Sequence, residues 1–305
     1  MNFETVEKAR VAYAAKQRAA KITALVVFLI SLLIAIITMR SASGIVFALP
    51  IFAPLFAYGI ASIFASKPYI AYRRAYKAYF VEQTMQKTFT NLHYDHTKGL
   101  DKNLLRQTGM INTGDRYSAD DLTIAKYKNV ALAQSDAHIE EEHTDSEGHT
   151  SYTTIFRGRI MLFEFPKKFN FKLELIGRRF TAYQVPGKNP TTGRKMSKMQ
   201  TESGEFNRSF RIYGEDGFET FYILDPAFMV KIDAISDRYQ NNILFGFLEN
   251  KLLIALNNGK DSFEPPRKAS VPLIEQVELA KVTSDIKIIT DFVDQLSLDR
   301  KLFQS

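Results

Sequence analysis

The sequence predicts an α+β fold, with a two-helix hairpin at the N-terminus followed by a mostly antiparallel α+β domain that ends in an amphipathic helix. Two apolar blocks without a charged residue, Ile22–Met39 and Ile45–Ala65, predict the hairpin. After them come eight or so short runs with a period of two, separated by turn residues, which predict strands. Helical patterns do not alternate with these strands as they do in parallel βαβ proteins, so the sheet should be mostly antiparallel.

Each apolar block has the length of a membrane span. At about 1.5 Å per residue, the two blocks would extend roughly 27 and 32 Å as helices, about the thickness of the hydrocarbon core. Neither block has the polar face, with a period near 3.6 residues, that a soluble core helix shows. We therefore expect a transmembrane hairpin over residues 22–66. Its spans at 22–39 and 45–65 should run antiparallel, because only five residues link them.

Two alternative interpretations of this region remain open on the sequence. Ser41-Ala42-Ser43 follows an apolar run and a basic leader, as in a cleaved signal peptide, although the run is long and a second block follows at once. The other alternative is a buried hairpin of a soluble protein, against which the missing polar face argues. The transmembrane hairpin accounts for more of these features.

The net charge of +7 is concentrated beside the apolar blocks. Residues 1–77 hold ten of the 40 Lys and Arg and two of the 33 Asp and Glu, a charge of +8, which leaves −1 for the rest. A domain that binds nucleic acid needs its own basic field, so nucleic acid is excluded as a partner. Basic residues flanking both spans place the two termini and the domain on the cytoplasmic side. The lipid bilayer is the first predicted partner.

Several kinds of chemistry are excluded by what the chain lacks. The 305 residues include no cysteine, which excludes disulfides and thiol catalysis. Gly187–Lys195 superficially resembles a phosphate loop, but its glycines are one residue too far apart and Arg194 stands where lysine is required. The apolar blocks contain no charge, which argues against transport by this chain alone. The sequence predicts no cofactor.

Four regions are expected along the chain. Residues 1–21 should form a basic N-terminal helix, 22–66 the transmembrane hairpin, 67–91 a juxtamembrane stalk helix, and 92–305 the cytoplasmic α+β domain. Four tyrosines at helical spacing in the stalk form either an aromatic belt at the membrane interface or a face that packs on the domain; they are Tyr69, Tyr72, Tyr76 and Tyr79. Residues 184–205 have almost no large apolar side chain and are expected to form a long mobile loop.

Turn and capping residues delimit the elements of the domain. Gly158 interrupts a long strand and marks a bulge or a close approach of another segment. Asp225 and Pro226 provide an N-cap and a first-turn proline for a helix to about Tyr239. Two further helices are expected at Leu100–Gln107 and at about Pro272–Leu296. The expected strands are Thr123–Tyr127, Val130–Glu141, Thr150–Phe165, Phe171–Ile176, Phe210–Tyr213, Phe218–Leu224, Ile243–Leu248 and Lys251–Leu256.

Two groups of residues are weak candidates for binding a metal ion. His93 and His96 would lie one helical turn apart, a spacing suited to a transition metal, but no third ligand is near. The alternative for them is the polar end of a helix. The second group lies in the acidic segment 140–149 and comprises Glu140, Glu142, His143, Asp145 and His149. Oxygen donors suit calcium, although the register of an EF-hand is absent, and the alternative is a solvated hairpin tip that prevents edge pairing. The sequence assigns no metal and no catalytic residue.

A stripe of alanines recurs every fourth residue in the second apolar block, at Ala53, Ala57, Ala61 and Ala65. Small residues at this spacing allow two helices to approach closely in lipid. Ser31 and Ala35 offer the same spacing in the first block, so the expected partner is the other span of the same chain or a second copy. The alternative is that alanine only tolerates lipid.

Three stretches carry a resemblance to a known family: Phe206–Met229, Ile243–Pro265 and, more weakly, Ile155–Asn170. Together with the N-terminal hairpin, they resemble the bacterial two-span membrane proteins catalogued as domain of unknown function 3137. The matching residues are turns, strands and a helix cap in a fixed order, and no catalytic motif comes with them. The resemblance implies a multi-pass protein of the bacterial inner membrane and leaves its activity open.

Three hypotheses for the function follow. The first is a membrane-anchored cytoplasmic binding or scaffold module of unknown ligand. The second is a membrane-tethered metal-dependent or hydrolytic enzyme, which requires the acidic segment 140–149 to converge with His93 and His96 in a pocket. The third is an accessory subunit of a membrane assembly, with a membrane-protein partner or self-association. Because no catalytic constellation is evident, the sequence favours the first hypothesis and a protein that is not an enzyme.

Overall fold

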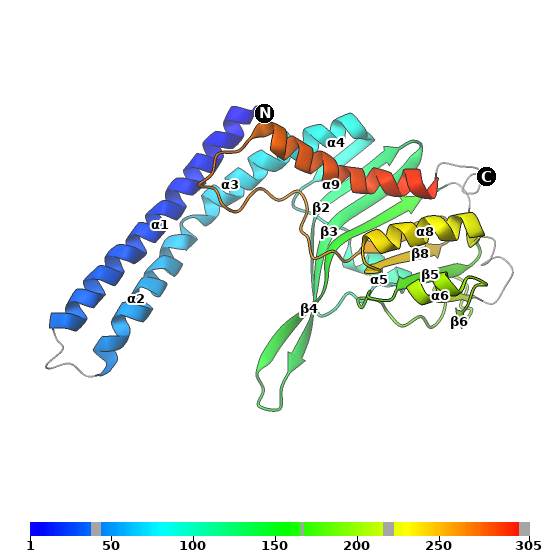
Figure 1. Cartoon of the computed structure of the whole chain (residues 1–305), viewed down its shortest axis with the longest axis horizontal. Coiled ribbons are helices and arrows are strands. Elements are labelled where there is room, and N and C mark those ends of the chain that lie inside the picture. Colours follow the sequence, from blue (N-terminus) through cyan, green and yellow to red (C-terminus); the bar gives the residue numbers. More distant parts are fainter. Residues whose placement is uncertain (38–43, 166–167, 216–222, 299–305) are drawn as a thin grey trace. The chain divides into compact units, whose positions relative to one another are not determined.

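The computed structural model describes residues 1–37, 44–165, 168–215 and 223–298 and divides the chain into two compact units. The first, called here the helical unit, comprises Met1–Thr84 and Glu264–Val282. The second, the sheet unit, comprises Met85–Phe263 and Thr283–Ser305. Figure 1 shows the elements of both units with their labels. The fold is mixed α+β, and one long apolar helix lies at its N-terminus.

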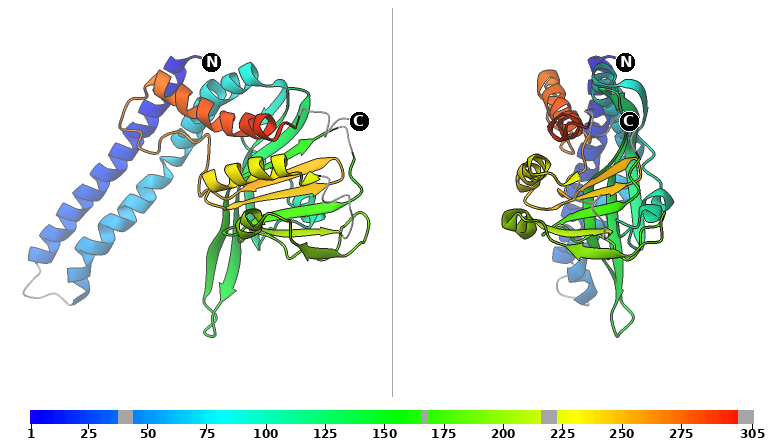
Figure 2. Two further views of the ribbon diagram at one scale, coloured as in Figure 1. Left: turned by 45° about the vertical axis from the view of Figure 1, so that its right-hand side comes forward. Right: turned by 90° about the vertical axis from the view of Figure 1, so that its right-hand side faces the viewer.

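The helical unit begins with α1, Phe3–Ile37, a single helix of 35 residues. It joins the expected basic helix and the first apolar block without a break, because no glycine or proline separates them. α1 packs along α2 (Gly44–Ile63) and α3 (Ser66–Tyr76), as Figures 1 and 2 show. Pro50 and Pro54 lie inside α2.

Within the described residues, α1 is long and apolar enough to cross a membrane by itself. A second candidate exists only if Pro50–Ile63 and Ser66–Thr88, which are bent by 47° at their junction, count as one span. Many large apolar side chains of α1, of α2 and of the turn after α2 are exposed, among them Ile22, Leu25, Leu29, Ile30, Leu33, Ile36, Phe52, Leu55, Phe56, Ile63 and Phe64. Exposed apolar surface of this extent marks an interaction with lipid or protein.

The expected stalk helix is divided into three parts. After α3, a π-helical segment η1 (Lys77–Glu82) leads into α4 (Gln83–Thr88), and the chain then enters the sheet. Tyr72 and Tyr76 are fully buried inside the helical unit. The Tyr76 hydroxyl donates a hydrogen bond to the Glu278 carboxylate over 2.6 Å. These two tyrosines therefore pack within the protein and do not form an interfacial belt.

An ion-pair group ties the C-terminal part of the helical unit to α3. The Glu264 carboxylate accepts hydrogen bonds from Arg73 Nε at 2.8 Å and lies 2.6 Å from the buried Lys77 Nζ. Burial acts to raise the pKa of Glu264, but the two cations outweigh it and the pKa is lowered. Arg10 of α1 is likewise buried and donates to the carbonyl of Ala269.

The sheet unit is built on nine strands in the order β1-β2-β3-β4-β9-β8-β5-β7-β6, and every neighbouring pair is antiparallel. The predicted antiparallel sheet is confirmed. The strands are β1 (Thr90–Asp95), β2 (Arg116–Tyr127), β3 (Val130–Thr144), β4 (Thr150–Glu164), β5 (Lys172–Gly177), β6 (Met196–Met199), β7 (Phe210–Glu215), β8 (Ile243–Leu248) and β9 (Lys251–Leu256).

Helices cover both faces of the sheet (Figure 2). On one face lie α8 (Pro226–Arg238) and the part of α9 (Glu275–Leu296) that belongs to this unit, with Phe228 against Phe247 and Phe292 against Phe245. α5 (Lys102–Thr108) lies on the opposite face, and the short α6 (Gly204–Ser209) precedes β7. The Asp101 carboxylate caps α5 by accepting from the backbone N–H of Asn103 and Leu104.

Two sequence expectations for the domain are wrong. Residues 90–95 form strand β1, whereas the stalk helix was expected to continue to residue 91. The segment 184–205, expected to be one long loop, contains strand β6, which pairs with β7 between Met196 and Met199. β1 and β6 lie at the two edges of the sheet and contain many polar residues. Such a strand is defined by its backbone pairing with a neighbour, and its sequence shows no alternating apolar pattern. The strand expected at Phe218–Leu224 lies almost wholly outside the described residues.

A buried ion pair lies on β5, between β8 and β7 of the sheet. Lys172 Nζ is 2.8 Å from the Glu174 carboxylate, and both side chains are almost completely buried. Burial raises the pKa of Glu174 to about 6, although Lys172 acts in the opposite direction. The folded protein therefore holds a proton on Glu174 at a pH where the unfolded chain has lost it.

We expect this carboxyl group to make stability fall as the pH rises. Below the unfolded pKa, near 4.5, both states are protonated; between 4.5 and 6 only the folded state keeps the proton, so the free energy of unfolding decreases. The decrease amounts to about 2 kcal/mol in total. Replacing Glu174→Gln should remove it, measured as the difference between parent and variant unfolding free energies from pH 4 to pH 7. The exposed control Glu205→Gln should follow the parent, and an unchanged pH profile in Glu174→Gln would contradict the prediction.

A candidate binding site on strands β2, β3 and β4

Two rows of polar side chains cross strands β2, β3 and β4. The register pairs Ser118 with His138 and His138 with Arg157, which forms the first row. Two residues away on each strand, Asp120 pairs with Asp136 and Asp136 with Arg159, which forms the second row. Because side chains two residues apart in a strand point to the same face, both rows share one face of the sheet. It is the face on which α9 lies, since Arg159 contacts that helix.

The second row contains a buried and well-connected ion pair. Arg159 and Asp136 are 2% and 3% exposed, and Arg159 Nε donates to the Asp136 carboxylate over 3.0 Å. The second oxygen of Asp136 accepts from the backbone N–H of Ser262 at 2.7 Å. Arg159 Nη1 donates to the Asp285 carbonyl at 2.7 Å, and its guanidinium lies 4.5 Å from the centre of the Phe263 ring. This pair fixes the floor of the site.

A cavity of about 190 Å³ lies over these rows. It is called here the β2–β4 pocket, and its polar lining is Ser118, Asp120, Asp136, His138, Arg157, Lys260 and Asp261. His138 Nε2 is 2.9 Å from the Thr154 hydroxyl, and Arg157 lies 3.5 Å from Asp261. Charges of both signs line the pocket, so it suits a small polar ligand that carries both donors and acceptors.

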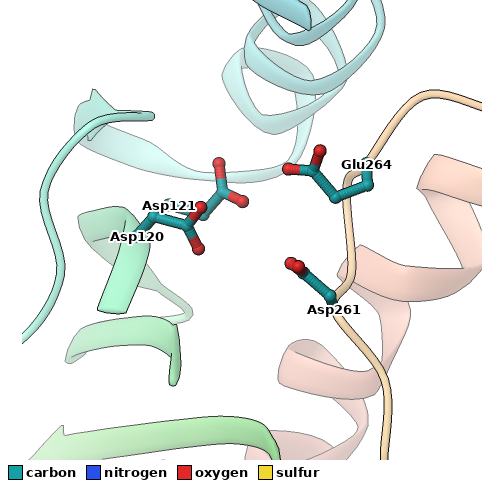
Figure 3. A group of neighbouring side chains, drawn as sticks. All are labelled: Asp120, Asp121, Asp261 and Glu264. Carbon is teal, nitrogen blue, oxygen red and sulfur yellow. The ribbon is translucent and has the colours of Figure 1, made fainter. Parts of the chain in front are cut away.

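Two carboxylates of the pocket lining, Asp120 and Asp261, lie close to a third carboxylate, that of Asp121 (Figure 3). Asp120, Asp121 and Asp261 each present an oxygen within 4.8 Å of the others. Asp121 is fully buried, has a positive φ of 57° at the bulge in β2, and accepts a hydrogen bond from the Tyr94 hydroxyl at 2.5 Å. Oxygen donors at this spacing suit a hard divalent cation, but proximity alone does not define such a site. Glu264, also drawn in Figure 3, belongs to the helical unit and its ion-pair group.

The structure places the two predicted groups of metal candidates at different ends of the strands. His93 lies in strand β1 and His96 in the turn after it, so the expected helical spacing of the two imidazoles is wrong. His93 pairs with Ile124, and Ile124 pairs with Ala133 of β3. From Ala133 to Glu140 is seven residues, about 23 Å along the strand. The histidines and the acidic segment therefore do not converge.

The acidic segment forms the tip of the β3–β4 hairpin. Glu140, Glu142 and His143 lie at the end of β3, and Asp145 and His149 lie in or beside the turn. The Asp145 carboxylate accepts from the backbone N–H of His149 and of Glu147, which lowers the pKa of Asp145. From Glu142 to His149 every side chain is exposed. Asp145 is thus used to close the turn, as expected for a solvated hairpin tip.

Three alanines of the stripe lie on the less exposed side of α2, and the fourth, Ala65, lies just after this helix. Ala65 is buried and Ala53, Ala57 and Ala61 are half-buried, whereas Phe52, Phe56 and Phe64 are at least 65% exposed. On α1, the helix that packs along α2, Ser31 and Ala35 are buried. The small side chains that were expected to meet are therefore buried on α1 and half-buried on α2.

Sequence reasoning missed the two polar rows, although each strand carried a signal. Asp136 and His138 are two residues apart in the run Val130–Ile139, and Arg157 and Arg159 are two apart around Gly158. Charged residues at alternate positions of a long strand mark a face that is polar or paired. The sequence alone does not show that these residues lie side by side, because their proximity depends on the register of three strands.

Comparison with known proteins gives one family and one distant structure. A family model described as "Protein of unknown function (DUF3137)" matches residues 154–298. No curated protein matches the chain. The crystal structure of the mycobacterial trehalose monomycolate transport factor A, TtfA, is similar over 73% of this chain and 94% of that chain, with 9% identity and a TM-score of 0.39. From β4 to the end of the described chain, residues 154–298 match the DUF3137 family, and the resemblance inferred from the sequence is confirmed.

Proposed function

We propose that this protein is a membrane-anchored binding or scaffold module, whose sheet unit works on the cytoplasmic side of a bacterial inner membrane. The observation that carries the proposal is the exposed apolar surface of α1 and α2. Between Ile22 and Ile37 most large side chains of α1 are exposed. Phe52 and Phe56 of α2, and Phe64 just after it, are 65%, 74% and 70% exposed. In water this surface would drive aggregation, whereas in lipid it is the expected exterior of a span.

A second span in α2 is part of the proposal. The small residues of the alanine stripe would let α2 lie closely against Ser31 and Ala35 of α1, which is how helices associate in lipid. The basic residues that flank both helices then keep the two termini on the cytoplasmic side. The same stripe could serve a second copy, so a membrane-protein partner or self-association stays within the proposal.

The binding role rests on the β2–β4 pocket. It combines a buried, rigid ion pair as its floor with half-exposed polar side chains of both charge signs as its walls. Such a lining recognises a ligand by hydrogen bonds and charge. The enzyme hypothesis loses support, because it needs His93 and His96 beside the acidic segment and the strand register separates them. No observation favours the accessory-subunit hypothesis over the binding module.

The topology of the proposed anchor is tested by labelling single cysteines in a chain that has none of its own. We expect Ser41→Cys, between the spans, to react with a membrane-impermeant maleimide added to intact spheroplasts, because it faces the outside. Ser146→Cys, at the exposed hairpin tip of the sheet unit, should react only after the membrane is permeabilised.

Two results would contradict the proposal. Labelling of Ser146→Cys in intact spheroplasts would place the sheet unit outside the cytoplasm. Release of the whole chain from membranes by carbonate at high pH would show that α1 and α2 do not span the bilayer. The parent chain without cysteine provides the background for both measurements.

A further inference from the structure

A second cavity, of about 240 Å³, lies inside the helical unit among α1, α2 and α3. Six of its lining side chains carry a hydroxyl or an amide, and none carries a charge; they are Tyr13, Gln17, Tyr58, Ser62, Ser66 and Tyr69. Two alanines complete the lining. The volume is below the roughly 300 to 1,000 Å³ of a site that encloses a drug-sized molecule, so the cavity suits a headgroup and not a whole lipid.

The chemistry of this lining favours hydroxyl groups as ligands. Tyr13 already accepts a hydrogen bond from Gln17 Nε2 at 2.6 Å, and Ser66 donates to the Ile63 carbonyl at 2.7 Å. Each of these hydroxyls still has a lone pair or a proton to offer, as have Tyr58 and Ser62. A polyol both donates and accepts, whereas a phosphate or an ammonium group would lose its hydration in an uncharged cavity without a counter-ion.

Two lysines follow residues of the lining in the sequence, and neither lines the cavity itself. Lys21 follows Gln17 by four residues in α1, which places both on the same face of that helix. Lys67 directly follows Ser66 at the start of α3. Both lysines are exposed. An anionic group held by these two lysines would lie outside the uncharged lining. The hydroxyls and the amide of the cavity would then face an uncharged part of the same ligand.

Apolar surface also begins beside the lining in the sequence. Ile22 is 61% exposed and directly follows Lys21, and Ile63 at the end of α2 and Phe64 after it are 68% and 70% exposed. These three surfaces are an uncharged polar cavity, two lysines and exposed apolar side chains. They match a ligand that is hydroxylated at one end, anionic in its middle and apolar at the other end. We propose that the cavity binds the headgroup of a phosphatidylglycerol-type phospholipid, with its glycerol in the cavity and its phosphate near Lys21 and Lys67. This inference rests on the proposed membrane anchoring of α1 and α2.

The test measures lipid selectivity on the full chain in nanodiscs. Native mass spectrometry of chains released from nanodiscs with equal amounts of phosphatidylglycerol, phosphatidylserine, phosphatidylethanolamine and a neutral glycosyl diacylglycerol gives the lipid retained. Phosphatidylglycerol should be retained over phosphatidylserine, which has the phosphate but no glycerol headgroup. Tyr58→Phe with Ser62→Ala should lower this preference about fivefold, the effect of losing one or two hydrogen bonds. Tyr152→Phe, which removes a tyrosine hydroxyl from the sheet unit, should leave it unchanged.

The role of the two lysines is tested separately. Lys21→Gln with Lys67→Gln should lower retention of phosphatidylglycerol several-fold and leave that of the neutral glycosyl lipid as it was, and Lys8→Gln on the same helix α1 is the matched control. Equal retention of phosphatidylglycerol and phosphatidylserine by the parent chain would overturn the inference. So would a glycosyl lipid retained as strongly as phosphatidylglycerol, because the phosphate would then contribute nothing. A chain that enters nanodiscs but shows no selectivity fails this inference alone, whereas a chain that does not enter them overturns the proposed function as well.

Discussion

Replacing Arg159→Leu is expected to destabilise the sheet unit by about 3 to 5 kcal/mol, the usual cost of leaving one partner of a buried ion pair without the other. Asp136 is 3% exposed, and without Arg159 it would keep the hydrogen bond from the Ser262 N–H. A lone carboxylate in this position would be deprived of both water and its counter-ion. For a unit of about 200 residues, the loss corresponds to a fall of roughly 10 °C in the melting temperature.

The measurement is thermal unfolding of the full chain in detergent micelles, followed by far-ultraviolet circular dichroism. Arg157→Leu is the matched control on the same strand, because Arg157 is half-exposed and its pair with Asp261 over 3.5 Å is solvent-accessible. It should cost about 1 kcal/mol or less. The double variant Arg159→Leu with Asp136→Leu should recover part of the loss, since it removes the unpaired charge. If Arg159→Leu melts within about two degrees of the parent, the ion pair does not stabilise the floor of the site.

Local chemistry made several elements of the sheet unit predictable. Asp225 accepts from the backbone N–H of Phe228 and Pro226 occupies the first turn of α8, as the sequence indicates. Strands β8 and β9 have the predicted bounds, because an apolar run on each side of Glu249-Asn250 leaves one register for the hairpin. In such cases the residues that decide the structure are neighbours in the sequence.

The candidate site could not be predicted in the same way. The polar rows bring together residues of β2, β3, β4 and the segment after β9, and a shift of one residue in any pairing would turn its side chains to the other face. The bulge at Asp120 and Asp121 is one such shift, and the register of β2 against β3 changes across it.

Residue propensity also fails to predict the secondary structure at His93, since the segment His93–His96 suits the end of a helix as well as a strand. Only the pairing of β1 with β2 decides between them.

Gly158 was predicted to mark a bulge or a close approach, and the structure shows a close approach of β4 to the chain after β9. A Cβ atom on Gly158 would lie 2.1 Å from the Leu256 carbonyl oxygen and 3.1 Å from the backbone nitrogen of Asn258. Its φ of +157° is also a conformation that side chains other than glycine rarely adopt. Because the nearest atoms are backbone, no side-chain rotation can relieve the contact.

We therefore expect Gly158→Ala to cost about 3 kcal/mol or more and to separate the end of β9 from β4. Two hydrogen bonds on this contact should be lost with it, from Gly259 N–H to the Arg157 carbonyl at 2.8 Å and from Arg157 N–H to the Asn257 side chain at 3.0 Å. Hydrogen–deuterium exchange of the full chain should then become faster in peptides that cover β4 and β9. Gly187→Ala is the control, because a Cβ atom there would have no other atom within 4 Å. Its effect should stay within about 1 kcal/mol.

Unchanged exchange in β4 and β9 of Gly158→Ala would contradict the prediction, because it would mean that the two strands accommodate the methyl group. The floor of the β2–β4 pocket would then be more adaptable than its geometry indicates.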